Sequence, residues 1–153
     1  ALKEDAGGSR FVLTPHAGEL RRLYQGIFGA ENTPSMEKLK VELWTYAGRI
    51  AKELRVTVAA KDARTAVCKT GEKICLNIAG NSGMATAGSG DVLAGMITAL
   101  LAQGIGSYEA ACRGVRIHAL SGDRAAEKFG EHALRAGDLI AGLREAGKKE
   151  PKE

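Results

Sequence analysis

The sequence is poor in aromatic residues, and this scarcity limits what the protein can bind. Phe, Trp and Tyr together make up 5% of the 153 residues, with a single Trp. Proteins that bind single-stranded nucleic acid stack successive bases on exposed aromatic rings, so these few rings argue against such a platform. The net charge of +4 is small and forms no basic stripe, and we therefore expect no nucleic-acid partner.

Long apolar runs are also missing. No stretch approaches the roughly 20 apolar residues of a membrane-spanning helix, so we expect no membrane partner. The first residues lack the charged and apolar regions of a secretory signal peptide. Cys68, Cys75 and Cys112 are an odd number without metal-ligand spacing, which is typical of free thiols in a reducing compartment. Cys68 and Cys75 could face each other across a hairpin, but core positions are the simpler reading. These features predict a cytoplasmic protein.

What remains is the composition of one globular domain. Hydrophobic residues make up 44% of the chain and charged residues 26%, and 153 residues can bury a sizeable core. Residues 147–153 (GKKEPKE) are a short charged tail that we expect to be solvated. We therefore predict that residues 1–146 belong to one domain.

Strand and helix patterns alternate in the first half of the chain, and helices follow one another in the second half. Short apolar runs predict strands over 11–13 and 56–60, and a Gly turn predicts a hairpin between 65–68 and 74–77. Apolar residues at helical spacing, with a loop over 26–34 and N-caps at Ser35 and Ser107, predict helices over 16–25, 36–54, 90–102, 108–129 and 135–146. This order is typical of the α/β class.

Residues 80–91 (GNSGMATAGSGD) are the most informative segment. Glycine lets the backbone approach a ligand closely, and the unpaired N–H groups at the start of the following apolar helix favour an anion such as phosphate. Asp91 does not suit an anion site, because its carboxylate repels phosphate, unless it takes a proton from a group that reacts there. The segment lacks the Lys of a Walker P-loop and the position of a dinucleotide fingerprint, so it predicts an anion hole beside an acid.

Two further polar segments directly follow predicted strands, where open α/β sheets bind ligands. Residues 14–19 (TPHAGE) offer His16 and Glu19, but an exposed histidine and an acid in the first turn of a helix explain them equally well. Residues 61–65 (KDART) offer two cations and a hydroxyl to a nucleotide, or form a charged turn. His118 lies among apolar residues of a predicted helix and is expected to be a core histidine.

Several segments, in order along the chain, resemble signatures of one family. Residues 81–91 (NSGMATAGSGD) resemble the N-P-G-M-A-T-x-G-S-G-D of the ADP/ATP-dependent NAD(P)H-hydrate dehydratases, which belong to the ribokinase-like (carbohydrate kinase) superfamily. Residues 13–19 (LTPHAGE) resemble the family's L-T-P-H-x-G-E, residues 61–65 its K-G-x-x-T, and residues 110–123 its helix ending in H-x-x-G/S-G-D. The resemblance implies the C-terminal half of a three-layer αβα sandwich, so residues 1–146 would be the C-terminal part of that domain, without its N-terminal part.

The same resemblance implies an activity and its partners. The enzyme would be a hydro-lyase that dehydrates hydrated NADH or NADPH through a phosphorylated intermediate, a reaction of nicotinamide nucleotide repair. It would use ADP or ATP as the phosphoryl donor, with Mg²⁺.

The resemblance assigns roles to the matching residues of this sequence. Asp91 would be the catalytic acid/base at the reacting hydroxyl and, with His16, would contact the hydrated nucleotide. Glu19 would act near Mg²⁺, through water. The anion hole would be formed by Gly88, Ser89 and Gly90. The adenine nucleotide would lie against Lys61, Asp62, Ala63, Arg64, Thr65 and Gly90.

The chain departs from the family pattern at three places. Ser82 replaces a common Pro, which is a mild change because both residues suit loops. Asp62 replaces the usual Gly, so its carboxylate would either repel nucleotide phosphate or face solvent. The family's long N-terminal stretch ends near D-A-D-A-L, whereas this chain begins at Ala1. We therefore expect either a fragment of a longer enzyme, or a second copy or companion chain that completes the sheet.

Two alternative functions stay open. A ribokinase-like kinase would phosphorylate a small molecule such as a vitamin precursor; His16, where many such kinases carry Asn, and the G-M-A-T run favour the dehydratase. A non-catalytic nucleotide-binding fragment is the other alternative. The sequence does not distinguish NADH from NADPH hydrate or ADP from ATP, and it does not reveal the oligomeric state or an epimerase domain fused upstream.

Overall fold

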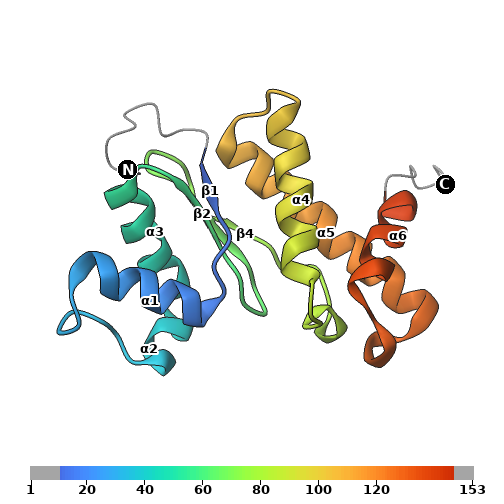
Figure 1. Cartoon of the computed structure of the whole chain (residues 1–153), viewed down its shortest axis with the longest axis horizontal. Helices are drawn as coiled ribbons and strands as arrows, with labels where there is room; N and C mark the ends of the chain where they lie inside the picture. Colours follow the sequence, from blue (N-terminus) through green and yellow to red (C-terminus); the bar gives the residue numbers. More distant parts are fainter. Residues whose placement is uncertain (1–10, 147–153) are drawn as a thin grey trace.

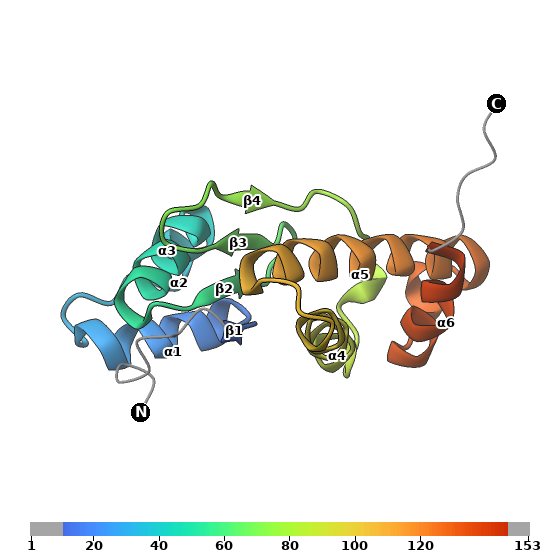
Figure 2. The same ribbon diagram turned by 90° about the horizontal axis from the view of Figure 1, so that it is seen from above.

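A four-stranded sheet lies between two groups of helices (Figures 1 and 2). The computed structural model describes residues 11–146, so the predicted tail over 147–153 lies outside the described residues. The strands lie in the order in which they follow one another along the chain: β1 (Val12–Leu13), β2 (Thr57–Ala60), β3 (Ala66–Cys68) and β4 (Cys75–Leu76). β1 pairs with β2 in parallel, whereas β3 pairs with β2 and β4 in antiparallel register.

The helices divide between the two faces of the sheet. One face is covered by α1 (Ala17–Phe28), α2 (Met36–Val41) and α3 (Leu43–Leu54). The other face is covered by α4 (Ser89–Ala102) and α5 (Ser107–Phe129), and α6 (Ala136–Ala146) packs on α5. Two short 3₁₀ turns, η1 (Ser82–Met84) and η2 (Glu131–Ala133), complete the chain order. The α/β class and the three-layer arrangement are confirmed.

The alternating side chains of β2 supply both cores. Val58 and Ala60 point into a cluster with α1, α2 and α3, whereas Ala59 points into a second cluster with α4 and α5. All four residues of β2 are buried, as expected for a strand covered on both faces. The carboxyl end of β2 is therefore held firmly, and Lys61 follows it directly.

The predicted helix over 36–54 is two helices. Glu42 has φ −113° and ψ 34°, which ends α2 and starts α3. Leu39 and Leu43, on either side of this break, are both buried in the same core cluster. Helical periodicity is nearly unbroken across Glu42, so the sequence pattern did not reveal the change of direction.

Two predicted helix ends also differ. α1 continues through part of the predicted loop to Phe28, because Ile27 and Phe28 pack against the core before Gly29, at φ 90°, ends the helix. Gly106, not Ser107, is the N-cap of α5. The hydroxyl of Ser107 instead accepts hydrogen bonds from Thr57 Oγ1 (2.9 Å) and Lys69 Nζ (3.3 Å).

The cysteines are free thiols. In the β3–β4 ladder Cys75 lies opposite Val67, so Cys68 and Cys75 lie one register position apart and contact different core clusters. Burial raises the pKa of Cys68 to about 11. Cys68 is therefore a core thiol, as the simpler reading predicted.

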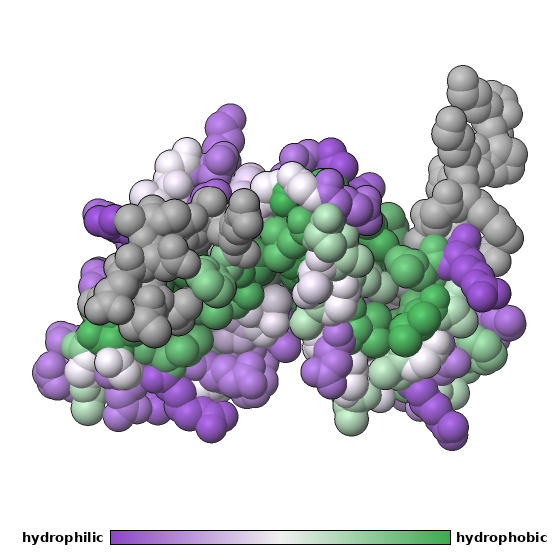
Figure 3. Space-filling view, turned by 45° about the horizontal axis from the view of Figure 1, so that its top comes forward, coloured by the Kyte–Doolittle hydropathy of each residue, from purple (hydrophilic) through white to green (hydrophobic). Residues whose placement is uncertain are grey.

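α4 carries more apolar surface than the described residues cover. The helix is apolar on nearly all sides, yet its buried residues are Ser89, Leu93 and Ile97. Figure 3 shows hydrophobic residues across the middle of one face of the molecule. In the described part of the chain, no helix combines the length and the hydropathy that a membrane span requires.

Two buried serines of α5 are expected to have opposite effects on stability when each is replaced by alanine. Ser121 Oγ is buried and has no hydrogen-bond partner within residues 11–146, whereas Ser107 is hydrogen-bonded to a buried threonine. We expect Ser121→Ala to raise the free energy of unfolding by about 1 kcal/mol, and Ser107→Ala to lower it by about 1–3 kcal/mol by leaving Thr57 unpaired. Urea denaturation of both variants measures the difference; equal destabilisation would contradict the assignment.

Candidate active site

The first turn of α4 presents backbone N–H groups to the space beside the sheet. Gly88 takes φ 85°, a left-handed conformation that favours glycine, and turns the chain into the helix. The N–H of Ser89 donates to the carbonyl oxygen of Thr86 (3.2 Å), and that of Asp91 donates to Gly88 (3.1 Å). The N–H groups of Gly88 and Gly90 have no partner among the described residues. Such groups, at the positive end of a helix dipole, attract an anion.

Lys61 places a cation beside the same turn. Its backbone N–H donates to the carbonyl oxygen of Pro15 (2.8 Å), which fixes the start of its side chain next to His16. A Cβ at Gly90 would lie 2.8 Å from Lys61 Nζ, so the ammonium lies directly against the first turn of α4. Among the side chains that the structure describes, no carboxylate forms an ion pair with this ammonium. The ammonium is therefore available to an anion.

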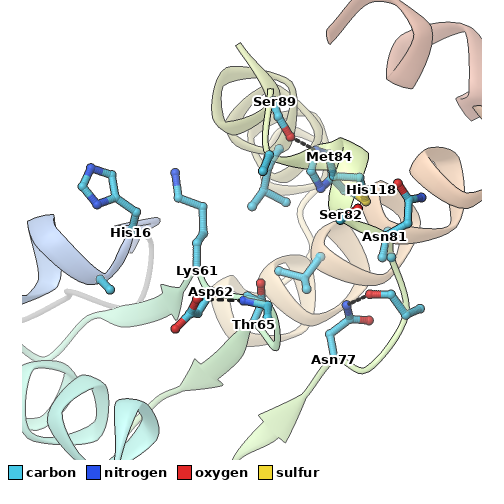
Figure 4. Close-up of a pocket in the computed structure, with 18 of the residues that line it drawn as sticks. His16, Lys61, Asp62, Thr65, Asn77, Asn81, Ser82, Met84, Ser89 and His118 are labelled. Carbon is cyan, nitrogen blue, oxygen red and sulfur yellow. Dashed lines mark hydrogen bonds between the residues drawn. The ribbon is translucent and has the colours of Figure 1, made fainter. Parts of the chain in front are cut away.

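Two cavities meet at Lys61. The larger cavity, of about 990 Å³, lies between β2, α2, the 80–91 segment and α5; the smaller, of about 740 Å³, lies between α1 and the start of α4. Lys61 lines both cavities. Figure 4 shows its side chain extending between His16 and the start of α4.

Most of the predicted nucleotide residues line the larger cavity. Lys61, Asp62, Ala63 and Thr65 do so, whereas Arg64 is exposed and lines neither cavity. Asp62 is exposed, and its Oδ1 accepts from the N–H of Ala63 (2.9 Å), so the carboxylate stays at the cavity rim.

The predicted reaction residues gather in the smaller cavity. Asp91, Gly90 and Glu19 line it together with Arg22. His16 lines the larger cavity instead, so the structure does not bring His16 and Asp91 into one cavity. Lys61 lines both cavities and so lies next to both groups of residues.

His16 caps the start of α1, a structural role that the sequence did not predict. Its Nδ1 accepts from the N–H groups of Gly18 (3.1 Å) and Glu19 (3.3 Å), and Glu19 Oε2 accepts from the N–H of His16 (2.9 Å). This reciprocal pair is a capping box at the start of α1. Because Nδ1 accepts both bonds, a neutral His16 carries its proton on Nε2, 3.4 Å from Glu19 Oε1.

Glu19 stays ionised next to these donors. The backbone N–H of His16 holds the pKa of the Glu19 carboxyl below its ordinary value of 4.5; partial burial opposes this shift, and the charges of His16 and Lys61 add to it. The carboxylates of Glu19 and Asp91 line the same cavity. Two carboxylates beside a phosphate-binding turn suit Mg²⁺, which prefers oxygen ligands and keeps several waters.

His118 is the residue whose position the sequence only partly predicted. It is buried, as expected of a core histidine, but it also lines the larger cavity. Its Nε2 lies 3.3 Å from Ser89 Oγ, at the start of α4. Burial lowers the pKa of His118 below its ordinary 6.5 and the Lys61 ammonium lowers it further, while a hydrogen bond to the Ser89 backbone opposes both. Asn77 also lines this cavity and lacked any signal in the sequence, whereas Met84, which lines it too, belongs to the segment over 80–91 that the sequence indicated.

Comparison with known proteins identifies the family of the chain. A family model described as NAD(P)H-hydrate dehydratase matches residues 4–144. The chain belongs to the NAD(P)H-hydrate dehydratase family. The predicted resemblance is therefore confirmed over nearly the whole chain.

Individual members of the NAD(P)H-hydrate dehydratase family extend well beyond this chain. The chain is 41% identical to the bifunctional NAD(P)H-hydrate repair enzyme Nnr of Thermofilum pendens over 129 residues. This match covers 84% of this chain and 23% of that protein. It is 35% identical over 139 residues to the ADP-dependent (S)-NAD(P)H-hydrate dehydratase of Neisseria meningitidis, covering 90% and 44%.

The fold agrees with a solved structure of the family. The ADP/ATP-dependent NAD(P)H-hydrate dehydratase of Bacillus subtilis, co-crystallized with ATP/Mg²⁺, superimposes with a TM-score of 0.77 at 27% identity, over 88% of this chain and 46% of that one. The fold is therefore ribokinase-like. The chain spans less than half the length of each of these three relatives.

Two substitutions of His16 measure what its capping box contributes to stability, without any ligand present. We expect His16→Ala to lower the free energy of unfolding by about 1 kcal/mol, because the first N–H groups of α1 lose their acceptor. His16→Asn keeps a capping oxygen and should stay within a few tenths of a kcal/mol of the parent. Thermal denaturation of the two variants checks this; equal losses would show that the cap contributes nothing.

Proposed function

We propose that this chain carries the phosphoryl-transfer site of an ADP- or ATP-dependent NAD(P)H-hydrate dehydratase, a hydro-lyase of nicotinamide nucleotide repair. The observation that carries the proposal is the position of Lys61, which lines both cavities and lies against Gly90, whose N–H has no partner among the described residues. A phosphoryl group held there would lie between a nucleotide in the larger cavity and an acceptor in the smaller one. The free cysteines agree with a reducing, cytoplasmic setting.

The adenine nucleotide would occupy the larger cavity. Lys61, Asp62, Ala63 and Thr65 would line it, with Arg64 at its exposed margin. The terminal phosphate would accept hydrogen bonds from the N–H groups of Gly88 and Gly90 and face the Lys61 ammonium. Donors already in place where charge develops lower the barrier, and each is worth about 3–4 kcal/mol when removed from comparable sites. The N–H of Ser89 is engaged by Thr86, so Ser89 would contribute to the anion hole by shaping its turn.

The hydrated nicotinamide ring would lie in the smaller cavity, with Asp91 at its hydroxyl group. Asp91 would take the hydroxyl proton as the oxygen attacks the terminal phosphorus, and the bond from that phosphorus to the nucleotide would break. In the second step the ring C–O bond breaks, phosphate leaves, and the ring loses a carbon-bound proton as the double bond re-forms. His16, beside Lys61, would contact the nucleotide part of the hydrate from the larger cavity.

Glu19 would hold Mg²⁺ through water at the entrance to this site. Its ionised carboxylate lines the smaller cavity beside Asp91, which fits the ion's preference for oxygen. When bound, Mg²⁺ neutralises charge on the phosphate oxygens.

The open surface of α4 and the free edge of β1 would be covered by further protein. β1 has one strand neighbour among the described residues, and α4 exposes apolar surface beside it. The matched B. subtilis structure continues for about as much chain again. We infer that the remaining part of the domain, a second copy or a companion chain completes the sheet here.

Product analysis tests the proposed function. Hydrated NADH or NADPH is incubated with the protein, Mg²⁺ and either ADP or ATP. A dehydratase returns the reduced nicotinamide absorbance and releases one phosphate per ring restored, with AMP or ADP as the other product. A stable phosphorylated product from another small molecule would favour the kinase alternative. Nucleotide binding without turnover, also when the missing part of the domain is added, would favour a non-catalytic fragment.

Asp91→Asn tests the acid/base assignment. The amide cannot take the hydroxyl proton, so we expect turnover to fall by at least about 100-fold, the usual contribution of a general base. ADP binding, measured by calorimetry, should stay within a few-fold of the parent because Asp91 lines the other cavity. Turnover close to that of the parent would overturn the assignment.

Asp62→Asn tests whether the departure from Gly affects the nucleotide. The Asn oxygen can still accept from the N–H of Ala63, so only the negative charge is removed. If the carboxylate repels phosphate, ADP binding should tighten by about two- to five-fold at low salt, and the gain should shrink as salt screens the charge. Unchanged affinity at all salt concentrations would show that Asp62 simply faces solvent.

A further inference from the structure

The segment over 80–91 touches α5 at both of its ends. At its start, Asp123 Oδ2 accepts from the N–H of Gly80 (3.1 Å), and Asp123 Oδ1 accepts from Asn81 Nδ2 (3.0 Å). Asn81 Oδ1 in turn accepts from the N–H of Gly83 (3.1 Å), which starts η1. One carboxylate on α5 therefore fixes the entry into the segment.

The exit of the segment is held one and a half helical turns earlier on α5. His118 Nε2 lies 3.3 Å from Ser89 Oγ, and both side chains are buried (Figure 4). Ser89 is the first residue of α4 and lies between Gly88 and Gly90, whose N–H groups are free. A change at His118 therefore reaches the anion-binding turn through Ser89.

The middle of the segment packs on the same stretch of α5. A Cβ at Gly122 would lie 2.3 Å from Met84 Sδ, so glycine is what lets the Met84 side chain lie against the helix. Met84 Sδ would also lie 3.1 Å from a Cβ at Gly80. Three contacts, at the start, middle and end of the segment, therefore come from residues 118–123.

We propose that residues 118–123 of α5 fix the anion-binding turn before any ligand arrives, with His118 and Asp123 as positioning residues. His118 acts through Ser89, and Asp123 acts through Asn81 and Gly80. Asp123 lines neither cavity, whereas His118 lines the larger cavity and not the smaller one where Asp91 lies. Their effect is to keep the N–H groups of the turn aimed at one point, which saves reorganisation when charge develops there.

Hydrogen exchange in the absence of nucleotide tests the structural half of the proposal. The segment contains backbone bonds whose protection can be measured, among them Met84 N–H to Asn81 and Val92 N–H to Gly88. We expect His118→Leu and Asp123→Asn to speed exchange in 80–92 by about 10-fold or more, while peptides from β2 and β3 stay unchanged. Arg116→Gln and Glu127→Gln, exposed positions on the same helix, are matched controls. Unchanged exchange in 80–92, or equal acceleration everywhere, would overturn the proposal.

A double-mutant cycle tests whether His118 acts through Ser89. Turnover is measured for His118→Leu, Ser89→Ala and the combination, with His118→Gln as the conservative variant that keeps a hydrogen-bonding group. We expect each single change to lower kcat about 10-fold with a smaller change in the KM for nucleotide, the combination to be no worse than either, and Gln to recover part of the loss. Additive losses, or equal loss with Gln and Leu, would overturn the assignment.

The double-mutant cycle rests on the proposed function, because it measures turnover. The proposed function and the positioning role can nevertheless fail separately. If the parent protein shows no dehydratase turnover, the proposed function fails, and the exchange data together with ADP binding still decide the positioning role. If turnover is present and exchange in 80–92 is unaffected by both variants, the positioning role alone is wrong.

Discussion

The ammonium of Lys61 lies against the first turn of α4, where the N–H groups of Gly88 and Gly90 have no partner among the described residues. Each side of this contact is fixed by a different part of the fold. β2 is buried on both faces, so the strand that carries Lys61 to the site cannot shift. The turn at Gly88 and Gly90 is held from the other side by α5. The Lys61 ammonium and the positive end of the α4 dipole repel each other at this distance, so an anion bound between them would be stabilised by both.

The same contact divides the site into two compartments. The larger cavity meets β2, α2 and α5, and the smaller one meets α1 and the start of α4. Of the two cavities, Asp91 lines only the smaller one. Under the proposed function this removes the conflict between an acid and a phosphate site, because the carboxylate would lie on the acceptor side and not on the nucleotide side. Glu19 also lines the smaller cavity and not the larger one, and the capping box of α1 fixes its position.

Much of this could be predicted from the sequence, because the relevant signals are local. The small-residue run before an apolar helix, and polar residues directly after strands, indicated segments that the structure places around the two cavities. The break at Glu42 and the Gly106 cap depend on packing that periodicity does not encode. The contact of His118 with Ser89 joins residues 29 positions apart, and an apolar helical neighbourhood predicts only burial. For the same reason, the sequence placed His16 and Asp91 together, whereas the two cavities separate them.

A structure of the protein with ADP bound tests the central claim most directly. The account predicts that the terminal phosphate lies within hydrogen-bonding distance of the Gly90 N–H and of Lys61 Nζ, with the adenosine in the larger cavity and the smaller cavity left open beside Asp91. Phosphate bound away from both groups, or an adenosine seated against Asp91, would contradict it.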